Sequence, residues 1–151
     1  MTERSVAGKM KEASIGRKGD FVIKGVGVDL ASISETKDAI DGDPVFERYA
    51  FTQRERSYAR SRGKAEEHFA VMLALKEAVT KALAPAAGKD VFDTKDIEVL
   101  HTAAGAPFVA DTPSFSAFLA AHGIESVHVS ATHEGEYACG IAVAEGPADN
   151  L

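Results

Sequence analysis

Hydrophobic residues occupy nearly every side of the predicted helix from Phe69 to Leu75, and charged residues follow directly after it. A helix without a polar face is normally buried in the core of a protein. The helical pattern extends over about residues 65–83, where Pro85 and Gly88 supply residues that commonly end a helix. We therefore predict one long buried helix near the middle of the chain.

Three charged residues interrupt this hydrophobic helix: Lys76, Glu77 and Lys81. A charge in apolar surroundings needs an opposite charge, a metal ion or a catalytic role. Glu77 and Lys81 lie one helical turn apart, so the simplest interpretation is an ordinary i,i+4 ion pair on a narrow solvent-facing strip. Other parts of the chain bear on whether that interpretation is sufficient.

The chain before this helix changes from polar to rich in β-branched residues. Residues 1–19 have no periodic hydrophobic face, and we expect a mobile extension with a short helix near residues 9–13. The run DFVIKGVGVDL then predicts a strand that ends in Asp29. Asp29 either caps the helix expected over residues 33–40 or has a ligand-binding or catalytic role, and the local pattern does not choose between these alternatives.

Two further helices are predicted before the long one. VFERYAF forms a short helix, and a capping box from Thr52 to Glu55 starts the next. That second helix is basic in an otherwise acidic protein. Such a run usually forms a solvated face, but it is also the one evident binding surface for an anionic partner. Its basic residues are Arg54, Arg56, Arg60, Arg62 and Lys64.

The C-terminal half of the chain is predicted to hold two hairpins and one helix. DIEVLHT and FVA, joined by the turn AAGAP, form the first hairpin, and Thr112 and Pro113 start a helix that ends at Gly123. SVHVSATH and EYACGIAVAE form the second hairpin, and residues 147–151 are expected to be a frayed tail. Alternation along SVHVSATH places Val127, Val129, Ala131 and His133 on one face and His128, Ser130 and Thr132 on the other.

This order of elements predicts the fold class. A strand, several helices, a hairpin, a helix and a second hairpin indicate an α+β fold, with a mainly antiparallel sheet packed against the long buried helix. The chain has 151 residues, of which 45% are hydrophobic. These values fit a single domain, which we place at residues 20–146.

Charge and cysteine content narrow the range of functions. A net charge of −6 argues against nucleic acid as the main partner. The single cysteine, Cys139, excludes a disulfide within the chain and favours a reducing compartment. No hydrophobic stretch reaches the length of a membrane span, and the basic N-terminal residues are not followed by the apolar run of a secretory signal. We therefore expect a cytoplasmic protein that does not bind a membrane.

Four residues able to take part in catalysis or ligand binding are predicted at positions that can come together in the fold. Asp29 and His133 are expected at strand ends, whereas Glu77 and Lys81 are on the buried helix. Two carboxylates without a cluster of cysteine or histidine suit a hard cation such as Mg²⁺, which commonly binds one or two carboxylates together with phosphate oxygens. A lysine one turn from a metal-bound carboxylate can neutralise phosphate charge. The residues alone thus suggest a phosphate-handling enzyme.

Five segments, in this order and at this spacing, resemble holo-[acyl-carrier-protein] synthase, the small AcpS-type branch of the 4′-phosphopantetheinyl transferases. The segments are GVGVDL, FTQRE, FAVMLALKEAVTKAL, GAP and HVSATHEGEYA, and the similar region covers residues 22–145. The resemblance implies transfer of 4′-phosphopantetheine from coenzyme A to a serine of an acyl carrier protein, with release of 3′,5′-ADP. It also implies the transferase fold and a homotrimer whose active sites lie between subunits. Whether the carrier serves fatty acid or polyketide synthesis stays open, as does the general base.

The resemblance also implies roles for individual residues. Asp29 and Glu77 match the family's carboxylates that bind Mg²⁺ together with the pyrophosphate of coenzyme A. Lys81 matches the second lysine of the KEAxxK motif, expected at the phosphate being transferred, and Lys76 is the first lysine of that motif. The other expected contacts to coenzyme A are Gly105 and Pro107 of the Gly-x-Pro turn, and Ser130 and His133 of the HVSxxH strand.

The chain departs from the family pattern at three positions. Met72 stands where an arginine is usual, beside Val71 in place of a glycine, and Glu35 stands where a basic residue usually faces the carrier protein. Two alternatives to an active transferase therefore stay open. One is a catalytically weak homologue that binds coenzyme A or a carrier without transfer. The other is a structural α+β domain in which these charges form local ion pairs.

Overall fold

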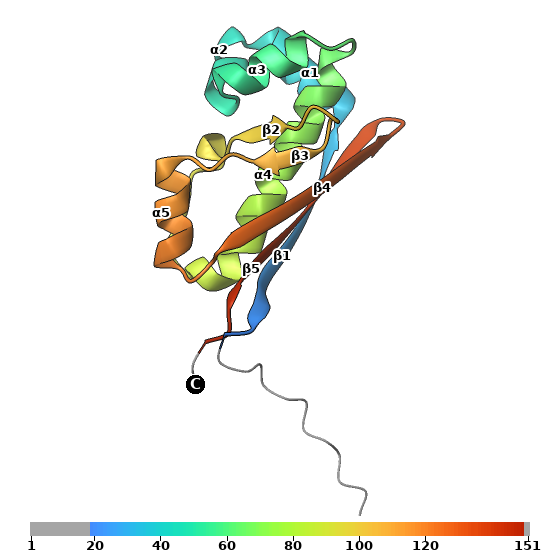
Figure 1. Ribbon diagram of the computed structural model, residues 1–151. Helices are drawn as coiled ribbons and strands as arrows, with labels where there is room; N and C mark the ends of the chain where they lie inside the picture. Colours follow the sequence, from blue (N-terminus) through green and yellow to red (C-terminus); the bar gives the residue numbers. More distant parts are fainter. Residues whose placement is uncertain (1–18, 150–151) are drawn as a thin grey trace, which may run out of the picture.

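The computed structural model describes residues 19–149 (Figure 1). The short helix expected near residues 9–13, and almost all of the expected N-terminal extension, therefore lie outside the described residues. Residues 150–151 of the expected tail lie outside them too. Within residues 19–149, no helix is long and apolar enough to cross a membrane.

The described chain begins with strand β1 and continues into a group of helices. These elements are β1 (Phe21–Ser32), α1 (Ile33–Gly42), α2 (Pro44–Ala50), α3 (Gln53–Arg60) and α4 (Ala65–Ala87). The second half holds a short 3₁₀ turn, two hairpins and one helix: η1 (Thr94–Asp96), β2 (Val99–His101), β3 (Pro107–Val109), α5 (Pro113–Ala121), β4 (Ser126–Glu134) and β5 (Tyr137–Pro147).

The long strands form one antiparallel sheet in the order β1-β5-β4, and β2 and β3 form a separate two-stranded hairpin. Helix α4 runs along one face of the sheet, while α1, α2 and α3 gather at one end of the molecule (Figure 1). The prediction of an α+β fold with an antiparallel sheet on a long buried helix is confirmed.

Small residues allow α4 to approach the sheet at backbone distance. A Cβ atom at Gly27 would lie 1.8 Å from the carbonyl oxygen of Ala78. At Gly25 it would lie 1.9 Å from the carbonyl oxygen of Ala82. No side chain fits into such a gap, so the two glycines of the GVGVDL run serve close packing between the helix and the sheet.

The remaining sides of α4 bury two groups of hydrophobic residues, as the apolar pattern predicted. One group faces the hairpins and α5, and the other faces the helices at the far end. The first includes Val79, Leu83, Ile97, Phe115 and Ile124, and the second includes Ile40, Phe51, Phe69, Met72, Leu75 and Val99.

Four boundaries differ from the predictions. Strand β1 does not end at Asp29 but continues to Ser32, because Leu30, Ala31 and Ser32 still pair with β5. Helix α4 continues to Ala87, so Pro85 lies inside its last turn and does not end it. A proline there forfeits only one hydrogen bond near the helix end, and Gly88, at a φ of 62°, supplies the predicted stop. The first hairpin has strands of three residues each. Strand β5 reaches Pro147, and the Ala148 amide donates to the Asp20 carbonyl at 2.8 Å, so the chain is held further than the expected tail boundary.

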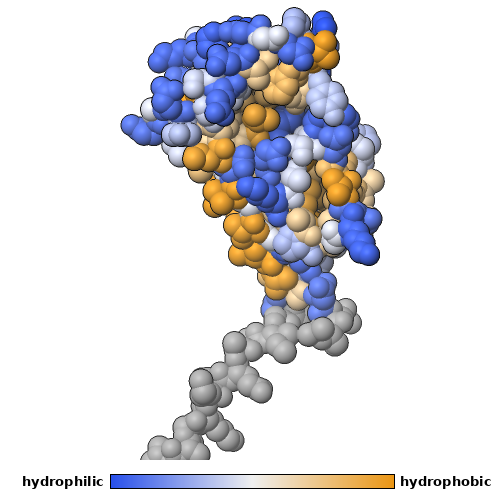
Figure 2. Space-filling view, turned by 180° about the vertical axis from the view of Figure 1, so that it is seen from behind, coloured by the Kyte–Doolittle hydropathy of each residue, from blue (hydrophilic) through white to orange (hydrophobic). Residues whose placement is uncertain are grey.

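The face of the sheet turned away from α4, called the outer face here, exposes large hydrophobic side chains. Val28 and Leu30 are 56% and 60% exposed. A band of hydrophobic residues is visible on one flank of the molecule in Figure 2. An exposed hydrophobic face of this kind commonly marks a surface that binds a partner. Its members include Val26, Val28, Leu30 and Ile141, with His128, Ser130 and Thr132 beside them on β4.

Candidate active site

Lys81 forms an ion pair with Asp29, not with Glu77. The Lys81 ammonium group lies 2.8 Å from Asp29 Oδ1 and 3.0 Å from the backbone carbonyl of Val28. The simple interpretation of a Glu77–Lys81 pair within one helix is therefore wrong. The capping alternative for Asp29 is wrong as well, because Ser32 caps α1 and its hydroxyl accepts from the Glu35 amide at 3.2 Å.

Glu77 lies on α4 one turn before Lys81, so it faces the same flank of the helix. Among residues 19–149, no hydrogen bond or ion pair satisfies its half-buried carboxylate. The described chain also has no group of three or more His, Cys, Asp or Glu side chains able to hold a metal. A cation held by Asp29 and Glu77 must therefore take its other ligands from water or phosphate, as Mg²⁺ commonly does.

Lys76 points away from this place into the core. Its side chain is 1% exposed, and its ammonium group lies 2.6 Å from a carboxylate oxygen of Glu55, which is fully buried. Burial lowers the pKa of Lys76, and the charge and hydrogen bonds of Glu55 oppose that change. The expected contact between Lys76 and coenzyme A does not fit this geometry, because the buried ammonium has no surface to offer a ligand.

A pocket of about 150 Å³ brings together three of the other predicted residues: Gly105, Pro107 and His133. We call it the His133 pocket. Ser130 is not among its lining residues, because it lies on the outer face and pairs with Ile141 on β5. The pocket is completed by Tyr58, Glu67, His68, Val71, His101, Ala131 and Thr132.

Aromatic and basic side chains shape one wall of the His133 pocket. The rings of Tyr58 and His101 stack with centroids 3.9 Å apart and planes 3° apart, and the Arg62 guanidinium lies 4.9 Å from the Tyr58 centroid. Burial lowers the pKa of His101, and the charges of His68 and Arg62 add to the effect. Burial and Arg62 likewise lower the pKa of His68. Tyr58, His68 and His101 were not predicted as site residues, because no spacing rule in the sequence links α3, α4 and β2.

Helix α4 separates the His133 pocket from the Asp29 ion pair. Asp29, Gly140 and Ala131 are neighbours across the three strands of the sheet. A Cβ at Gly140 would lie 2.8 Å from the backbone of Ala74, so the helix lies over this middle position. Asp29 therefore lies on one flank of α4, and the pocket lined by Ala131 lies on the other.

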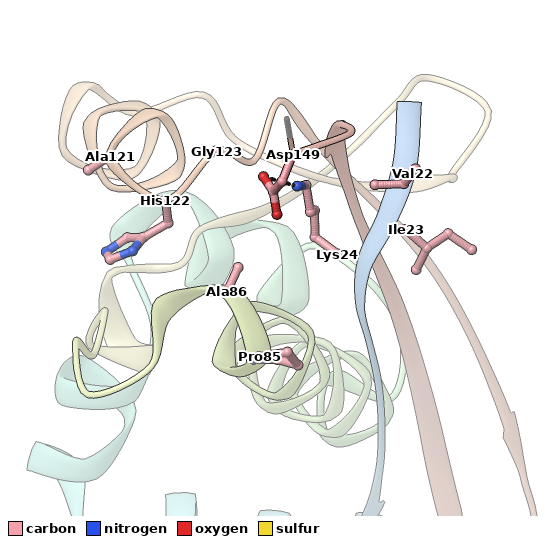
Figure 3. A pocket seen from close by; sticks show the side chains of 9 residues that line it. All are labelled: Val22, Ile23, Lys24, Pro85, Ala86, Ala121, His122, Gly123 and Asp149. Carbon is pink, nitrogen blue, oxygen red and sulfur yellow. Dashed lines mark hydrogen bonds and ion pairs between the residues drawn. The ribbon is translucent and has the colours of Figure 1, made fainter. Parts of the chain in front are cut away.

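A larger open pocket of about 620 Å³ lies at the C-terminal end of α4 (Figure 3). Lys24 from β1 reaches into it and pairs with Asp149 at 2.9 Å. The last turn of α4, with Pro85 and Ala86, and the C-terminal end of α5, at His122–Gly123, border it. The C-terminal ends of two helices therefore contribute partial negative charge. It contains none of the predicted site residues, and its size alone does not make it the active site.

The sequence of this chain is similar to those of known enzymes. A family profile described as the 4′-phosphopantetheinyl transferase superfamily matches residues 25–142. The chain belongs to this superfamily. It is 37% identical over 131 residues to a holo-[acyl-carrier-protein] synthase of Desulforudis audaxviator, covering 85% of this chain and 98% of that protein. It is also 35% identical over 133 residues to the holo-[acyl-carrier-protein] synthase of Mycobacterium tuberculosis, covering 83% and 98%.

Solved structures of phosphopantetheinyl transferases share the fold. The acyl carrier protein synthase of Mycobacterium tuberculosis matches with a TM-score of 0.66 and 35% identity, over 83% of this chain and 100% of that one. A Chronobacterium ammoniagenes ACPS–CoA complex matches with a TM-score of 0.70 and 26% identity, over 81% and 96%. The resemblance to holo-[acyl-carrier-protein] synthase is confirmed, and with it the enzyme class of phosphopantetheinyl transferase.

Most basic residues of the predicted basic helix are already paired with carboxylates, so fewer of them are available to an anion than the sequence suggested. Arg54 is paired with Glu98, and Arg60 with Glu47. Lys64 lies 3.5 Å from Glu67. Arg56 and Arg62 form no ion pair with any residue between 19 and 149, and Arg62 stands beside the His133 pocket.

The two main departures from the transferase pattern have different surroundings. Met72 is fully buried among core residues, including Phe51 and Phe69, so it fills space where the family usually has a charge. Glu35 is exposed in the first turn of α1, where a carboxylate is favourable at a helix N-terminus. The first substitution is explained by packing in this chain, and the second changes the charge of an open surface.

Proposed function

We propose that this phosphopantetheinyl transferase moves the 4′-phosphopantetheine group from coenzyme A to a serine of an acyl carrier protein, with Mg²⁺ and with release of 3′,5′-ADP. The main support is the meeting of Lys81 with Asp29 at 2.8 Å, one turn from a Glu77 that has no partner among the described residues. One ammonium and two carboxylates suit a cation-bound pyrophosphate. Coenzyme A complexes of similar transferases support the substrate.

The residues present fit a magnesium ion. Lys81 bonds to Oδ1 of Asp29, while Oδ2 makes no hydrogen bond within residues 19–149. The side chain of Asp29 is 23% exposed, so a hydrated cation can reach it. Asp29 and Glu77 would hold the ion, and the ion would supply charge neutralisation on the pyrophosphate. Lys81, which is paired with Asp29, would add a positive charge beside the same pyrophosphate.

The reaction requires in-line displacement at the β-phosphate of coenzyme A. The serine oxygen of the carrier forms a bond to phosphorus, and the bond from phosphorus to the bridging oxygen breaks. The bridging oxygen leaves with 3′,5′-ADP, and a general base takes the serine proton. Lys81 is placed to stabilise the negative charge on the transferred group, which is largest in the transition state.

The His133 pocket is the proposed place for the nucleotide of coenzyme A. Gly105 has a φ of 87°, a backbone conformation that only glycine adopts easily. Because it has no side chain, the edge of the pocket stays open at this position. Arg62 and the imidazole of His133 supply groups that attract phosphate and hydrogen-bond a nucleotide. Ser130 lies on the outer face and would contact the nucleotide from a different subunit.

Assembly of identical subunits would bring the Asp29 ion pair of one subunit next to the His133 pocket of another. The two halves of the proposed site lie on opposite flanks of α4, so one chain does not present them to a single ligand directly. The outer face exposes Val26, Val28 and Leu30, the kind of surface that a second copy covers. We propose that copies associate through this face as a homotrimer, with each active site completed by a neighbouring subunit.

A mass measurement tests the function. The protein is incubated with coenzyme A, Mg²⁺ and an apo carrier protein, and the carrier is expected to gain the mass of one phosphopantetheinyl group. Chelation of Mg²⁺ is expected to stop the gain. If several carriers, including the organism's own, gain no mass while coenzyme A still binds, the alternative of a catalytically weak homologue is correct.

A further inference from the structure

Lys76 and Glu55 form an ion pair that is closed to solvent. Their side chains are 1% and 0% exposed, and the Lys76 ammonium lies 2.6 and 2.9 Å from the two carboxylate oxygens. The same ammonium lies 3.4 Å from the backbone carbonyl of Lys95. All three donors of the ammonium thus have acceptors inside the protein, and the proposed reaction uses neither charged group.

Glu55 extends this network to two further parts of the chain. Its Oε1 accepts from the backbone amide of Val99, the first residue of β2, at 2.7 Å. Its Oε2 accepts from the backbone amide of Thr52, the N-cap of α3, at 2.8 Å. A hydrophobic pair of similar volume would leave both amides without this acceptor, which explains why a charged pair occupies the core here.

The elements tied to Glu55 are those that build one wall of the His133 pocket. Helix α3 carries Tyr58, and β2 carries His101, whose ring stacks on it at a centroid distance of 3.9 Å. The turn after β2 supplies Gly105, and β3 begins with Pro107, so the hairpin contributes two more lining residues. A shift of α3 or of the hairpin relative to α4 would therefore change the pocket directly.

We propose that Lys76 is a positioning residue: through Glu55 it holds α3 and the β2–β3 hairpin on α4 and thereby sets the shape of the His133 pocket. The inference rests on the proposed function, in which this pocket takes the nucleotide of coenzyme A. Because Asp29 and Lys81 lie on the other flank of α4, loss of Lys76 affects the binding of coenzyme A more than the chemical step.

Three variants test the proposal at temperatures where each is folded: Lys76→Met, Lys76→Arg and, as a control on the same helix, Leu83→Ala. Leu83 is 3% exposed and packs in the core cluster that contains Phe115, away from Glu55. Lys76→Met is expected to raise the Kd and KM for coenzyme A about tenfold and to change kcat less than about twofold. Lys76→Arg keeps the charge and is expected to fall between Lys76→Met and the wild type. An unchanged Kd in Lys76→Met, or an equal increase in Leu83→Ala, overturns the proposal.

Amide hydrogen exchange tests directly whether Lys76 holds the hairpin in place. Amide hydrogen exchange at Val99 is expected to be faster in Lys76→Met than in Leu83→Ala, and unchanged protection overturns the proposal. If Lys76→Met does not fold, the double variant Lys76→Met/Glu55→Gln leaves no uncompensated charge and carries the same expectations for exchange and for coenzyme A. If the wild type itself does not bind coenzyme A, the proposed function fails, while the exchange result still decides whether Lys76 positions the hairpin.

Discussion

The ammonium group of Lys81 on α4 lies 2.8 Å from the carboxylate of Asp29 on β1, although 52 residues separate them in the chain. Lys81 also donates to the Val28 carbonyl at 3.0 Å, so β1 fixes its position. Glu77, one turn earlier, stays without a partner among residues 19–149. Where α4 crosses β1, the molecule thus offers one cation and one free carboxylate beside a paired one.

Removal of either carboxylate is expected to stop transfer without unfolding the protein. Asp29→Asn and Glu77→Gln keep the side-chain shape but remove charge from groups that are not part of the hydrophobic core, and transfer should fall by more than about 100-fold. The mass gain of the carrier measures transfer, and circular dichroism measures the melting temperature. Glu125→Gln, at an exposed position just before β4, serves as the control and should keep full activity. Full activity of both site variants would contradict the metal assignment.

Gly27 is expected to tolerate no side chain at all. Its added Cβ would lie 1.8 Å from the carbonyl oxygen of Ala78, and backbone cannot move aside as a flexible side chain can. Gly27→Ala should therefore lower the free energy of unfolding by more than about 3 kcal/mol, measured by urea denaturation. Gly63→Ala is the matched control, because no atom of residues 19–149 lies within 4 Å of its added Cβ and its φ is not positive. Equal stability of the two variants would refute the close approach of α4 to the sheet.

Local signals predicted most of the elements because their causes lie within a few residues. The capping box from Thr52 to Glu55, the Thr112 cap of α5 and the stop at Gly88 are all present. Alternation along β4 placed Ser130 and His133 on opposite faces, as found. Such features depend on the backbone within one turn or one strand, which the sequence displays directly.

Partners across long sequence distances could not be predicted in the same way. Lys81 has an acidic residue one turn away on its own helix but pairs with Asp29, because α4 crosses the sheet there. Lys76 is the first lysine of the motif that suggested a contact with coenzyme A, yet its side chain points into the core toward Glu55. Residues five positions apart on a helix point about 140° away from each other, so only the packing of α4 decides which lysine reaches the site.

Acidification is expected to destabilise the protein through the histidines of the His133 pocket. The pKa values of His68 and His101 are lowered from 6.5, mainly by burial, so the unfolded chain binds protons more readily than the folded one. Stability from this source is present above about pH 6.5 and is lost as the pH falls through the lowered pKa values. Urea denaturation at several pH values measures the effect. His101→Phe keeps a ring to stack on Tyr58 and should make the dependence on pH shallower. An unchanged dependence would show that His101 does not contribute.

A charge on the outer face is expected to prevent assembly. Val28 is 56% exposed and lies between Val26 and Leu30 along the hydrophobic face that we propose as the subunit interface. Val28→Lys would bury an unpaired ammonium in that interface, so the protein should elute as a monomer in size-exclusion chromatography with light scattering. Transfer should fall with it, because each site needs a neighbouring subunit. Val91→Lys is the control, since Val91 is 81% exposed in the loop after α4. A wild-type protein that is a fully active monomer would contradict both the interface and the shared site.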